Sequence, residues 1–266
     1  MIPDLSAAIR NNDLFLHYQP QVTADGLTLV AAEALVRWRD PRRGLVQPAQ
    51  FVHVAERNGL IDQLGCWVLE NACREAASWD AISVAVNVSP LQFRRHDFVD
   101  FVTRTASDAG LDFRNLELEI TETSYFDDPA RAEDSLRELR ALGIRIALDD
   151  FGVGYSSLSL LRRLPLDKIK IDRSFVAEVG LADGAAIVQA VVALACALGL
   201  KVTAEGIETV EQQRFLAACK CHFLQGYLFS RPVSATELTA YAERLRDPRD
   251  GRRSGGDEPL RAQDIA

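Results

Sequence analysis

The chain is poor in the side chains that bind zinc or form disulfide frameworks. It has 4 histidines and 5 cysteines among 266 residues, and the histidines do not show zinc-binding spacing. One short cluster, Cys219-Lys220-Cys221-His222, has no second ligand pair, so we interpret it as ordinary structure. The odd cysteine count and the chain length favour reduced thiols. A zinc protein and a disulfide scaffold are therefore both disfavoured.

Lysine is also scarce, since it occurs only at positions 168, 170, 201 and 220, and arginine supplies the remaining basic charge. The 30 basic residues face 38 acidic residues, which gives a net charge of −8. An acidic protein is a poor non-specific binder of nucleic acid or of anionic membranes. A phosphate ligand would need a local source of positive charge, and metal ions held by clustered carboxylates are one candidate.

The sequence has no apolar run long enough to cross a bilayer. The most apolar stretch, residues 185–200, is too short and contains Gln189. The N-terminus lacks the basic and then apolar order of a signal peptide. Hydrophobic residues make up 48% and charged residues 26%, as in ordinary globular proteins. We expect a cytoplasmic protein without a membrane span.

What the sequence does contain is an alternation of strand and helix patterns. Residues 14–22 and 27–38 read as a hairpin, because Ala24-Asp25-Gly26 forms a short connection. Further strands are predicted at 83–89, 116–121, 144–150, 167–172, 201–207 and 223–230. Helices are predicted from Asp4 and at 48–79 (interrupted at Gly59 and Gly65), 96–110, 129–143, 155–164, 185–198, 209–219 and 234–247.

Strands rich in Val, Ile and Leu, each followed by a helix, indicate parallel strands covered by helices. Eight strand candidates with intervening helices in roughly 245 residues match a (β/α) barrel. A doubly wound open sheet is the alternative, but the glycine-rich phosphate fingerprint that it often carries is missing. We predict a TIM-like (β/α) barrel with an antiparallel first strand over residues 1–246. Residues 247–266 read as a flexible polar tail.

Polar side chains gather at the carboxyl ends of the predicted strands, where barrels place their chemistry. They are Glu33, Asn87, Glu119, Asp149, Asp150, Lys170, Glu205 and Gln225. So many carboxylates would repel one another unless cations lay among them. Carboxylate and amide oxygens favour Mg²⁺ or Mn²⁺, and adjacent Asp149 and Asp150 suit a paired-metal site. Glu117 shares a face with Glu119, and this pattern gives it no function.

An ordered set of short motifs carries a family resemblance. The motifs are Tyr18-Gln19-Pro20, Glu33-Ala34-Leu35, Asn87-Val88-Ser89, Glu119-Ile120-Thr121-Glu122, Asp149-Asp150-Phe151-Gly152, Lys170-Ile171-Asp172, Ala204-Glu205-Gly206 and Gln225-Gly226-Tyr227. With them, the chain resembles the EAL-domain family of cyclic di-GMP phosphodiesterases over residues 5–245. The resemblance implies a (β/α) barrel whose first hairpin is antiparallel, and hydrolysis of cyclic di-GMP to linear pGpG.

The resemblance also implies roles for individual residues. Two Mg²⁺ or Mn²⁺ ions are expected on Glu33, Asn87, Glu119, Asp149 and Asp150. Lys170 matches the lysine that orients or polarises the attacking water. Glu205 matches a glutamate that serves as general base or as a ligand of the second metal. Substrate contacts are expected from Arg37, Gln225, Leu35 and Gln19.

Two further residues, Glu122 and Gly152, match positions that control the loop after Asp150. In the family this loop joins the metal site to a dimer interface, so we expect a homodimer. Residues 255–258 read Gly-Gly-Asp-Glu, which resembles the signature of diguanylate cyclases. A tail of 20 residues cannot form the domain that this signature needs.

Other functions remain open at this point. A degenerate member of the family would sense cyclic di-GMP, or bind a protein partner, without hydrolysis. A different metal-dependent barrel phosphodiesterase would act on another nucleotide. The chain is expected to be a stand-alone enzyme or an excised domain, and a regulatory domain or protein partner would then act in trans.

Overall fold

A computed structural model describes residues 2–11, 13–121, 128–152 and 158–246. The predicted loop residue Glu122 and the predicted tail 247–266 lie outside these described residues.

The strands of the described chain form one nine-stranded sheet. They are β1 (Leu14–Thr23), β2 (Leu29–Asp40), β3 (Gly44–Val46), β4 (Ser83–Val88), β5 (Leu116–Thr121), β6 (Arg145–Phe151), β7 (Lys168–Ile171), β8 (Lys201–Ala204) and β9 (Phe223–Gln225). From β2 through β4 to β9, neighbouring strands pair in parallel.

The first strand closes the sheet into a barrel. β1 pairs antiparallel with β2 on one side and with β9 on the other. β3 stays outside the closed ring, because it pairs only along the end of β2 in the described sheet. Both the predicted TIM-like barrel and its antiparallel first strand are confirmed.

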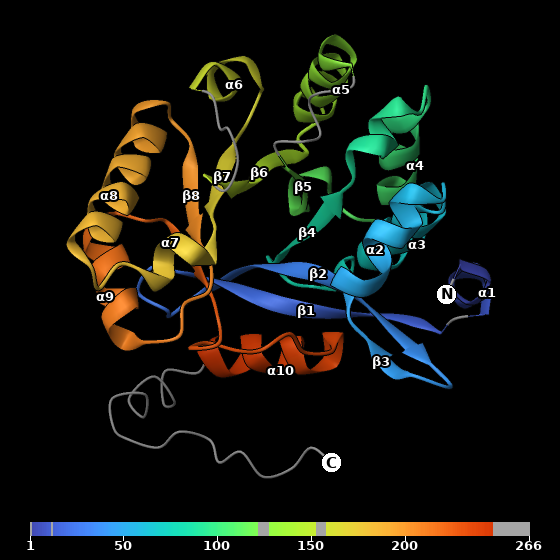
Figure 1. The fold of residues 1–266 in the computed structure, drawn as a ribbon, viewed down its shortest axis with the longest axis horizontal. Helices are drawn as coiled ribbons and strands as arrows, with labels where there is room; N and C mark the ends of the chain where they lie inside the picture. The colour runs from blue at the N-terminus through green and yellow to red at the C-terminus, as the bar shows by residue number, and fades with distance from the viewer. Residues whose placement is uncertain (1, 12, 122–127, 153–157, 247–266) are drawn as a thin grey trace.

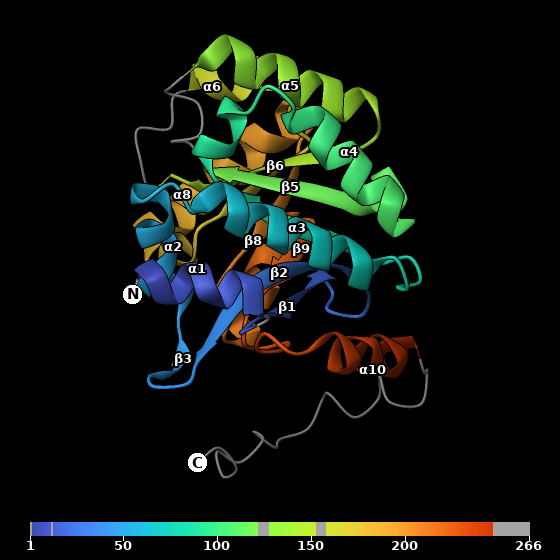
Figure 2. The ribbon, with the colours of Figure 1, turned by 90° about the vertical axis from the view of Figure 1, so that its right-hand side faces the viewer.

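Helices surround the barrel (Figures 1 and 2). They are α1 (Ile2–Asn11), α2 (Pro48–Arg57), α3 (Ile61–Ala76), α4 (Phe98–Ala109), α5 (Pro129–Ala141), α6 (Leu158–Arg163), α7 (Arg173–Ala177), α8 (Ala182–Ala197), α9 (Val210–Ala218) and α10 (Ala235–Arg246), with short 3₁₀ turns at Pro90–Arg94 and Phe113–Asn115. Among the described helices, none combines the length and the apolar character that a bilayer crossing requires.

Local sequence explains where several helices begin and end. The side chain of Asp128 accepts a hydrogen bond from the Arg131 amide, and Pro129 occupies the first turn of α5, where its missing N–H costs nothing. α4 ends at Gly110, which adopts a left-handed conformation with φ of 74°. These signals explain why sequence patterns located both ends of these helices to within a few residues.

Other boundaries differ from the sequence prediction. Gly65 does not interrupt a helix but lies buried inside α3, where a Cβ would collide with the side chain of Gln92. The last strand was predicted to reach residue 230 but ends at Gln225. The chain turns there because Gly226 packs against the backbone of Ile207, and the Leu228 amide donates to Ile207 O. Sequence patterns also missed β3 and α7.

Candidate active site

The polar residues predicted at the strand ends come together at one mouth of the barrel. Asn87 of β4 lies in register with Glu119 of β5, and Glu33 of β2 lies in register with Gln19 of β1. Because the parallel strands all end at this mouth, side chains distant in sequence become neighbours. The barrel topology therefore explains why these polar side chains lie close together.

Lys170 of β7 lies at the centre of the cluster. Its Nζ lies 2.7 Å from Glu119 Oε2 and 2.7 Å from Glu205 Oε1. The same nitrogen lies 3.1 Å from Asp149 Oδ1 and 3.5 Å from Glu33 Oε2. The lysine side chain is only 1% exposed. A single buried ammonium therefore faces four carboxylates from four different segments of the chain.

The charged groups in this cluster shift one another's pKa values. Burial by itself lowers the pKa of a lysine, but the surrounding carboxylates, with Asp149 and Glu119 foremost, raise the pKa of Lys170 well above its ordinary value. Burial also raises the pKa of Glu119 far above its usual range, and Lys170 offsets this only in part. The lysine thus stays protonated, while some of the acids resist ionisation.

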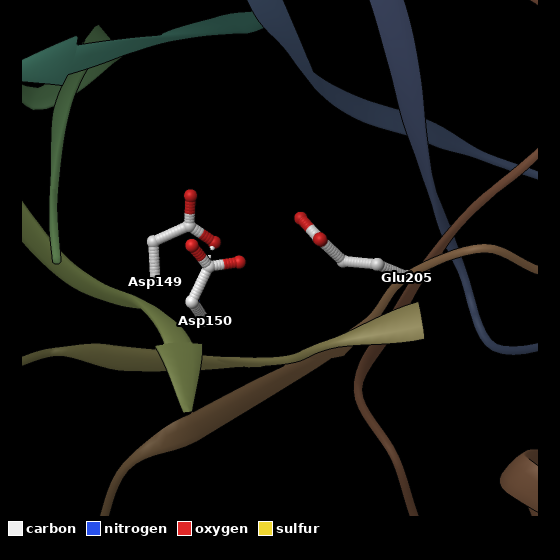
Figure 3. Close-up of side chains that lie close together, drawn as sticks. All are labelled: Asp149, Asp150 and Glu205. Carbon is white, nitrogen blue, oxygen red and sulfur yellow. Dashed lines mark hydrogen bonds between the residues drawn. The ribbon is translucent and has the colours of Figure 1, made fainter. Parts of the chain in front are cut away.

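Asp149 and Asp150 both reach the site because β6 is irregular at this point. Adjacent residues of a regular strand point to opposite faces. The pairing of β6 with β7 shifts by one residue between Leu148 and Phe151, and Asp150 has a φ of 55°. Such a bulge redirects the chain. Figure 3 shows the carboxylates of Asp149 and Asp150 pointing toward that of Glu205.

Glu205 follows directly after β8, and its amide donates to Ile171 O at the end of β7. Burial, together with the negative charges of Asp149 and Glu33, raises the pKa of Glu205 to about 7, against the opposing effect of Lys170. A carboxyl group with a pKa near neutrality can exchange protons at ordinary pH. Its position therefore suits proton transfer as well as metal binding.

Glu33 is held by amide donors on both of its oxygens. Asn87 Nδ2 donates to Oε1 over 2.7 Å, and Gln225 Nε2 donates to Oε2 over 2.6 Å. Gln225 Nε2 also lies 3.1 Å from Gln19 Oε1. Burial raises the pKa of Glu33, but Lys170 and these amides outweigh burial, so the pKa is lowered. The Glu33 carboxylate is consequently ionised and fixed in orientation.

The donor set fits hard divalent cations. One ligand oxygen from each of Asp149, Asp150 and Glu205 lies within 4.8 Å of the others. Burial and the neighbouring charge of Asp149 raise the pKa of Asp150, which shows that negative charge is crowded here. Added cations would relieve this crowding, and oxygen ligands suit Mg²⁺ or Mn²⁺. The acidic cluster is therefore consistent with the predicted metal site.

A cavity of ≈ 190 Å³ opens beside the acids, and Gln19, Leu35 and Gln225 line it. All three were predicted as substrate contacts. Arg37 is not among the described residues that line this cavity. It is half-buried, and its guanidinium donates to Val36 O over 3.0 Å.

The predicted loop residue Gly152 adopts a φ of +99°, and a Cβ there would lie 2.7 Å from Phe175 Cε2. This position needs glycine for both backbone and packing reasons. Its predicted partner in loop control, Glu122, lies outside the described residues.

Sequence reasoning missed several residues of the site. Arg173, Glu208 and Tyr227 also line the small cavity. A second and more apolar cavity, of ≈ 460 Å³, adjoins Leu35 and Asn87. The sequence offered one signal, since Tyr227 is the last residue of the motif Gln225-Gly226-Tyr227. Arg173 begins α7, which the sequence pattern missed, and Glu208 lies on a connection whose path the strand pattern did not predict.

Comparison with known proteins identifies the family. A family model described as "EAL domain" matches residues 3–232. The chain is 44% identical over 246 residues to the "Bifunctional diguanylate cyclase/cyclic di-GMP phosphodiesterase MucR" of Pseudomonas aeruginosa, covering 90% of this chain and 36% of MucR. It is 44% identical over 253 residues to the "Cyclic di-GMP phosphodiesterase NbdA" of the same species, covering 92% of this chain and 32% of NbdA.

A solved structure agrees with these sequence matches. The chain superposes on "PaMucR Phosphodiesterase, c-di-GMP complex" with a TM-score of 0.85 and 44% identity, covering 89% of this chain and 98% of that chain. The present chain spans about a third of the length of the curated relatives, MucR and NbdA. Fold, site geometry and similarity agree, and the chain belongs to the EAL domain family.

Proposed function

We propose that this chain hydrolyses cyclic di-GMP to linear pGpG with two Mg²⁺ or Mn²⁺ ions. The observation that carries the proposal is the environment of Lys170, a buried ammonium that faces four carboxylates at the barrel mouth. Every position that the family resemblance assigns to metal binding or proton transfer has a suitable side chain here. Similarity to MucR, whose structure is described as a c-di-GMP complex, supports the choice of substrate.

The expected metal ligands are Glu33, Asn87, Glu119, Asp149 and Asp150. When bound, divalent cations lower the pKa of water and stabilise charge on phosphate oxygens. The protein's own contribution is orientation, since amide donors hold Glu33 on both sides. The bulge in β6 brings Asp149 and Asp150 to the same site. These features fix the ligand oxygens before any ion arrives.

Lys170 and Glu205 are the catalytic residues of this proposal. Lys170 positions the attacking water beside the scissile phosphate and resists deprotonation, because carboxylates surround it and raise its pKa. Glu205 accepts a proton from that water, because its carboxylate lies beside Lys170 at the barrel mouth. We assign the proton to Oε2, because Oε1 already faces the lysine at 2.7 Å.

The substrate is expected to lie across the two cavities. Gln19, Leu35 and Gln225 line the small one, and Arg37 would pair with a phosphate through its guanidinium fork. The larger cavity is lined by apolar side chains such as Val52, Leu64 and Val68. An apolar wall of this kind suits a purine ring, so we place one guanine there.

The experiment is pGpG release, measured by chromatography after incubation with cyclic di-GMP and either Mg²⁺ or Mn²⁺. Asp149→Ala and Glu33→Ala should lose turnover, whereas Asp134→Ala, a variant of an exposed acid on α5, should keep it. Full turnover in both site variants would contradict the assignment. Binding of cyclic di-GMP without release of pGpG would instead indicate the receptor alternative, and a panel of other cyclic dinucleotides would test substrate choice.

The predicted homodimer remains a proposal alongside the activity. Light scattering with size-exclusion chromatography would measure the mass in solution. A mass of twice 29.4 kDa would support it, and a monomer at all concentrations tested would contradict it.

A further inference from the structure

A second buried ion pair lies beneath the catalytic cluster. Lys168 Nζ lies 2.5 Å from Glu117 Oε1, and the two side chains are 5% and 3% exposed. Lys168 precedes Lys170 by two residues on β7, and Glu117 precedes Glu119 by two on β5. Each pair shares a strand face, so this ion pair forms a layer one step deeper in the barrel.

The ion pair is linked to the upper layer through the fully buried side chain of Gln21. Lys168 Nζ donates to Gln21 Oε1 over 3.0 Å. On its other side, Gln21 Nε2 lies 3.5 Å from Glu119 Oε1. The second oxygen of Glu119, Oε2, is the one that contacts Lys170. Glu119 is therefore contacted by an amide on one oxygen and by an ammonium on the other.

The orientation of the Gln21 amide follows from chemistry. A lysine ammonium has three donors and no acceptor, so the amide oxygen of Gln21 must face Lys168. The amide nitrogen must then point the other way, toward Glu119. If Lys168 were absent, the amide oxygen of Gln21 would lose this donor, and the side chain could leave the position from which its nitrogen contacts Glu119. Lys168 thus helps to hold the nitrogen of Gln21 toward Glu119.

Glu117 makes this arrangement stable. A buried ammonium without a counter-charge is strongly destabilising, whereas a matched buried pair is close to neutral. Lys168 also lies 5.6 Å from the centre of the Phe223 ring, whose face favours a cation. Glu117, which the sequence pattern left without a function, is the counter-charge that pairs with Lys168 beneath the site.

We propose that Gln21 is a positioning residue for Glu119, held in its orientation by the Lys168–Glu117 ion pair, and that it sets how tightly the site binds divalent cations. The proposal rests on the proposed function only in taking Glu119 as a metal ligand. Partners of ligating carboxylates commonly change metal affinity by about 10- to 100-fold when they are removed.

The test measures Mn²⁺ affinity by electron paramagnetic resonance of the free ion, without any nucleotide. Gln21→Met keeps the length of the side chain and removes both polar contacts, so the Kd for Mn²⁺ should rise about tenfold. Gln21→Asn, which is one methylene shorter, provides a second variant with the same expected direction. Gln213→Met is the matched control, because Gln213 Nε2 makes a similar 3.5 Å contact to Ala24 O far from the site; its Kd should be unchanged.

A double-mutant cycle separates positioning from general stability. The double variant Lys168→Met/Glu117→Leu removes both charges of the ion pair at once. It should also raise the Kd for Mn²⁺. In the Gln21→Met background, however, the same pair of changes should have no further effect on the Kd. Additive effects in the cycle, or an unchanged Kd in folded Gln21→Met and Gln21→Asn, would overturn the proposal.

Failure of the positioning role and failure of the proposed function give different results, because one is measured by Mn²⁺ affinity and the other by release of pGpG. A wild-type chain that binds Mn²⁺ but releases no pGpG would contradict hydrolysis and leave the positioning role intact. A wild-type chain that binds no Mn²⁺ would overturn the positioning role. If the wild-type chain releases pGpG but Gln21→Met leaves the Kd for Mn²⁺ unchanged, the positioning role alone is overturned.

Discussion

Lys170 and Glu205 form an ion pair of 2.7 Å at the mouth of the barrel, joining the end of β7 to the segment after β8. The lysine is almost fully buried, and the glutamate side chain is 18% exposed. One partner therefore stays charged inside the protein while the other faces the cavity. This division suits a pair in which the lysine orients and the glutamate exchanges protons.

Replacing the central lysine should destabilise the metal-free protein. Lys170→Met leaves the four carboxylates without their ammonium, and loss of one partner of a buried charge cluster typically costs about 3–5 kcal/mol. The melting temperature without metal should fall, and saturating Mn²⁺ should raise it more in the variant than in the wild type, because cations replace the missing charge. Release of pGpG should be lost in both conditions.

Lys201→Met is the matched control, since Lys201 is exposed at the start of β8. Its melting temperature and its response to Mn²⁺ should match the wild type. Equal responses to Mn²⁺ in wild type and Lys170→Met would contradict the neutralising role of the lysine.

The contribution of Glu205 to the stability of the metal-free protein should fall as the pH rises from 4.5 to 7. The pKa of Glu205 rises from an ordinary value of 4.5 to about 7 on folding. In this window the folded state binds more protons than the unfolded state, so raising the pH lowers the free energy of unfolding. Urea unfolding in the presence of a chelator at pH 5 and pH 7.5 measures the fall. Glu205→Gln, which cannot ionise, should show a smaller fall; an identical fall in both proteins would be incompatible with this pKa.

Gly152→Ala should destabilise the protein more than the same change at another glycine with positive φ. Gly152 has a φ of +99° and faces Phe175, whereas Gly110 has a φ of +74° and nothing within 4 Å of the place that a Cβ would take. Both changes carry a backbone cost of about 1–2 kcal/mol, but only Gly152→Ala adds overpacking of about 1–3 kcal/mol. Urea unfolding compares them, and equal losses would show that Phe175 does not restrict this position.

Arg37→Met should raise the KM for cyclic di-GMP by about tenfold or more, because a guanidinium–phosphate contact is lost. Arg39→Met is the control, since the exposed Arg39 packs over the ring of Phe15 at 5.1 Å. Steady-state kinetics with Mg²⁺ separates KM from kcat. An unchanged KM for Arg37→Met would remove Arg37 from the phosphate contacts.

Much of the fold was accessible from the sequence because local and long-range signals agree. β5 was predicted at residues 116–121 and is observed there, since Leu and Ile alternate along it with Glu and Thr, a period typical of a strand. The hairpin of β1 and β2 was signalled by a short glycine-containing connection. The early end of β9 was not predictable, because it depends on contact between Gly226 and the backbone of Ile207.

The sequence predicted which residues belong to the site better than it predicted how their side chains are arranged. Glu33, Glu119 and Lys170 were predicted from strand parity and resemblance, and they do meet. Parity alone would have placed Asp149 and Asp150 on opposite faces, and only the bulge in β6 brings them together. Gln21 was overlooked, because its role depends on the barrel closing β1 against β9.

The central claim is that the acids at the barrel mouth hold divalent cations beside the substrate. A crystal structure with Mn²⁺ and cyclic di-GMP, with anomalous scattering measured at the manganese edge, tests it most directly. The account predicts two manganese peaks coordinated by Glu33, Asn87, Glu119, Asp149 and Asp150, with a phosphate of the nucleotide beside them. Nucleotide bound at the mouth without manganese peaks among these residues, or manganese bound only elsewhere, would contradict it.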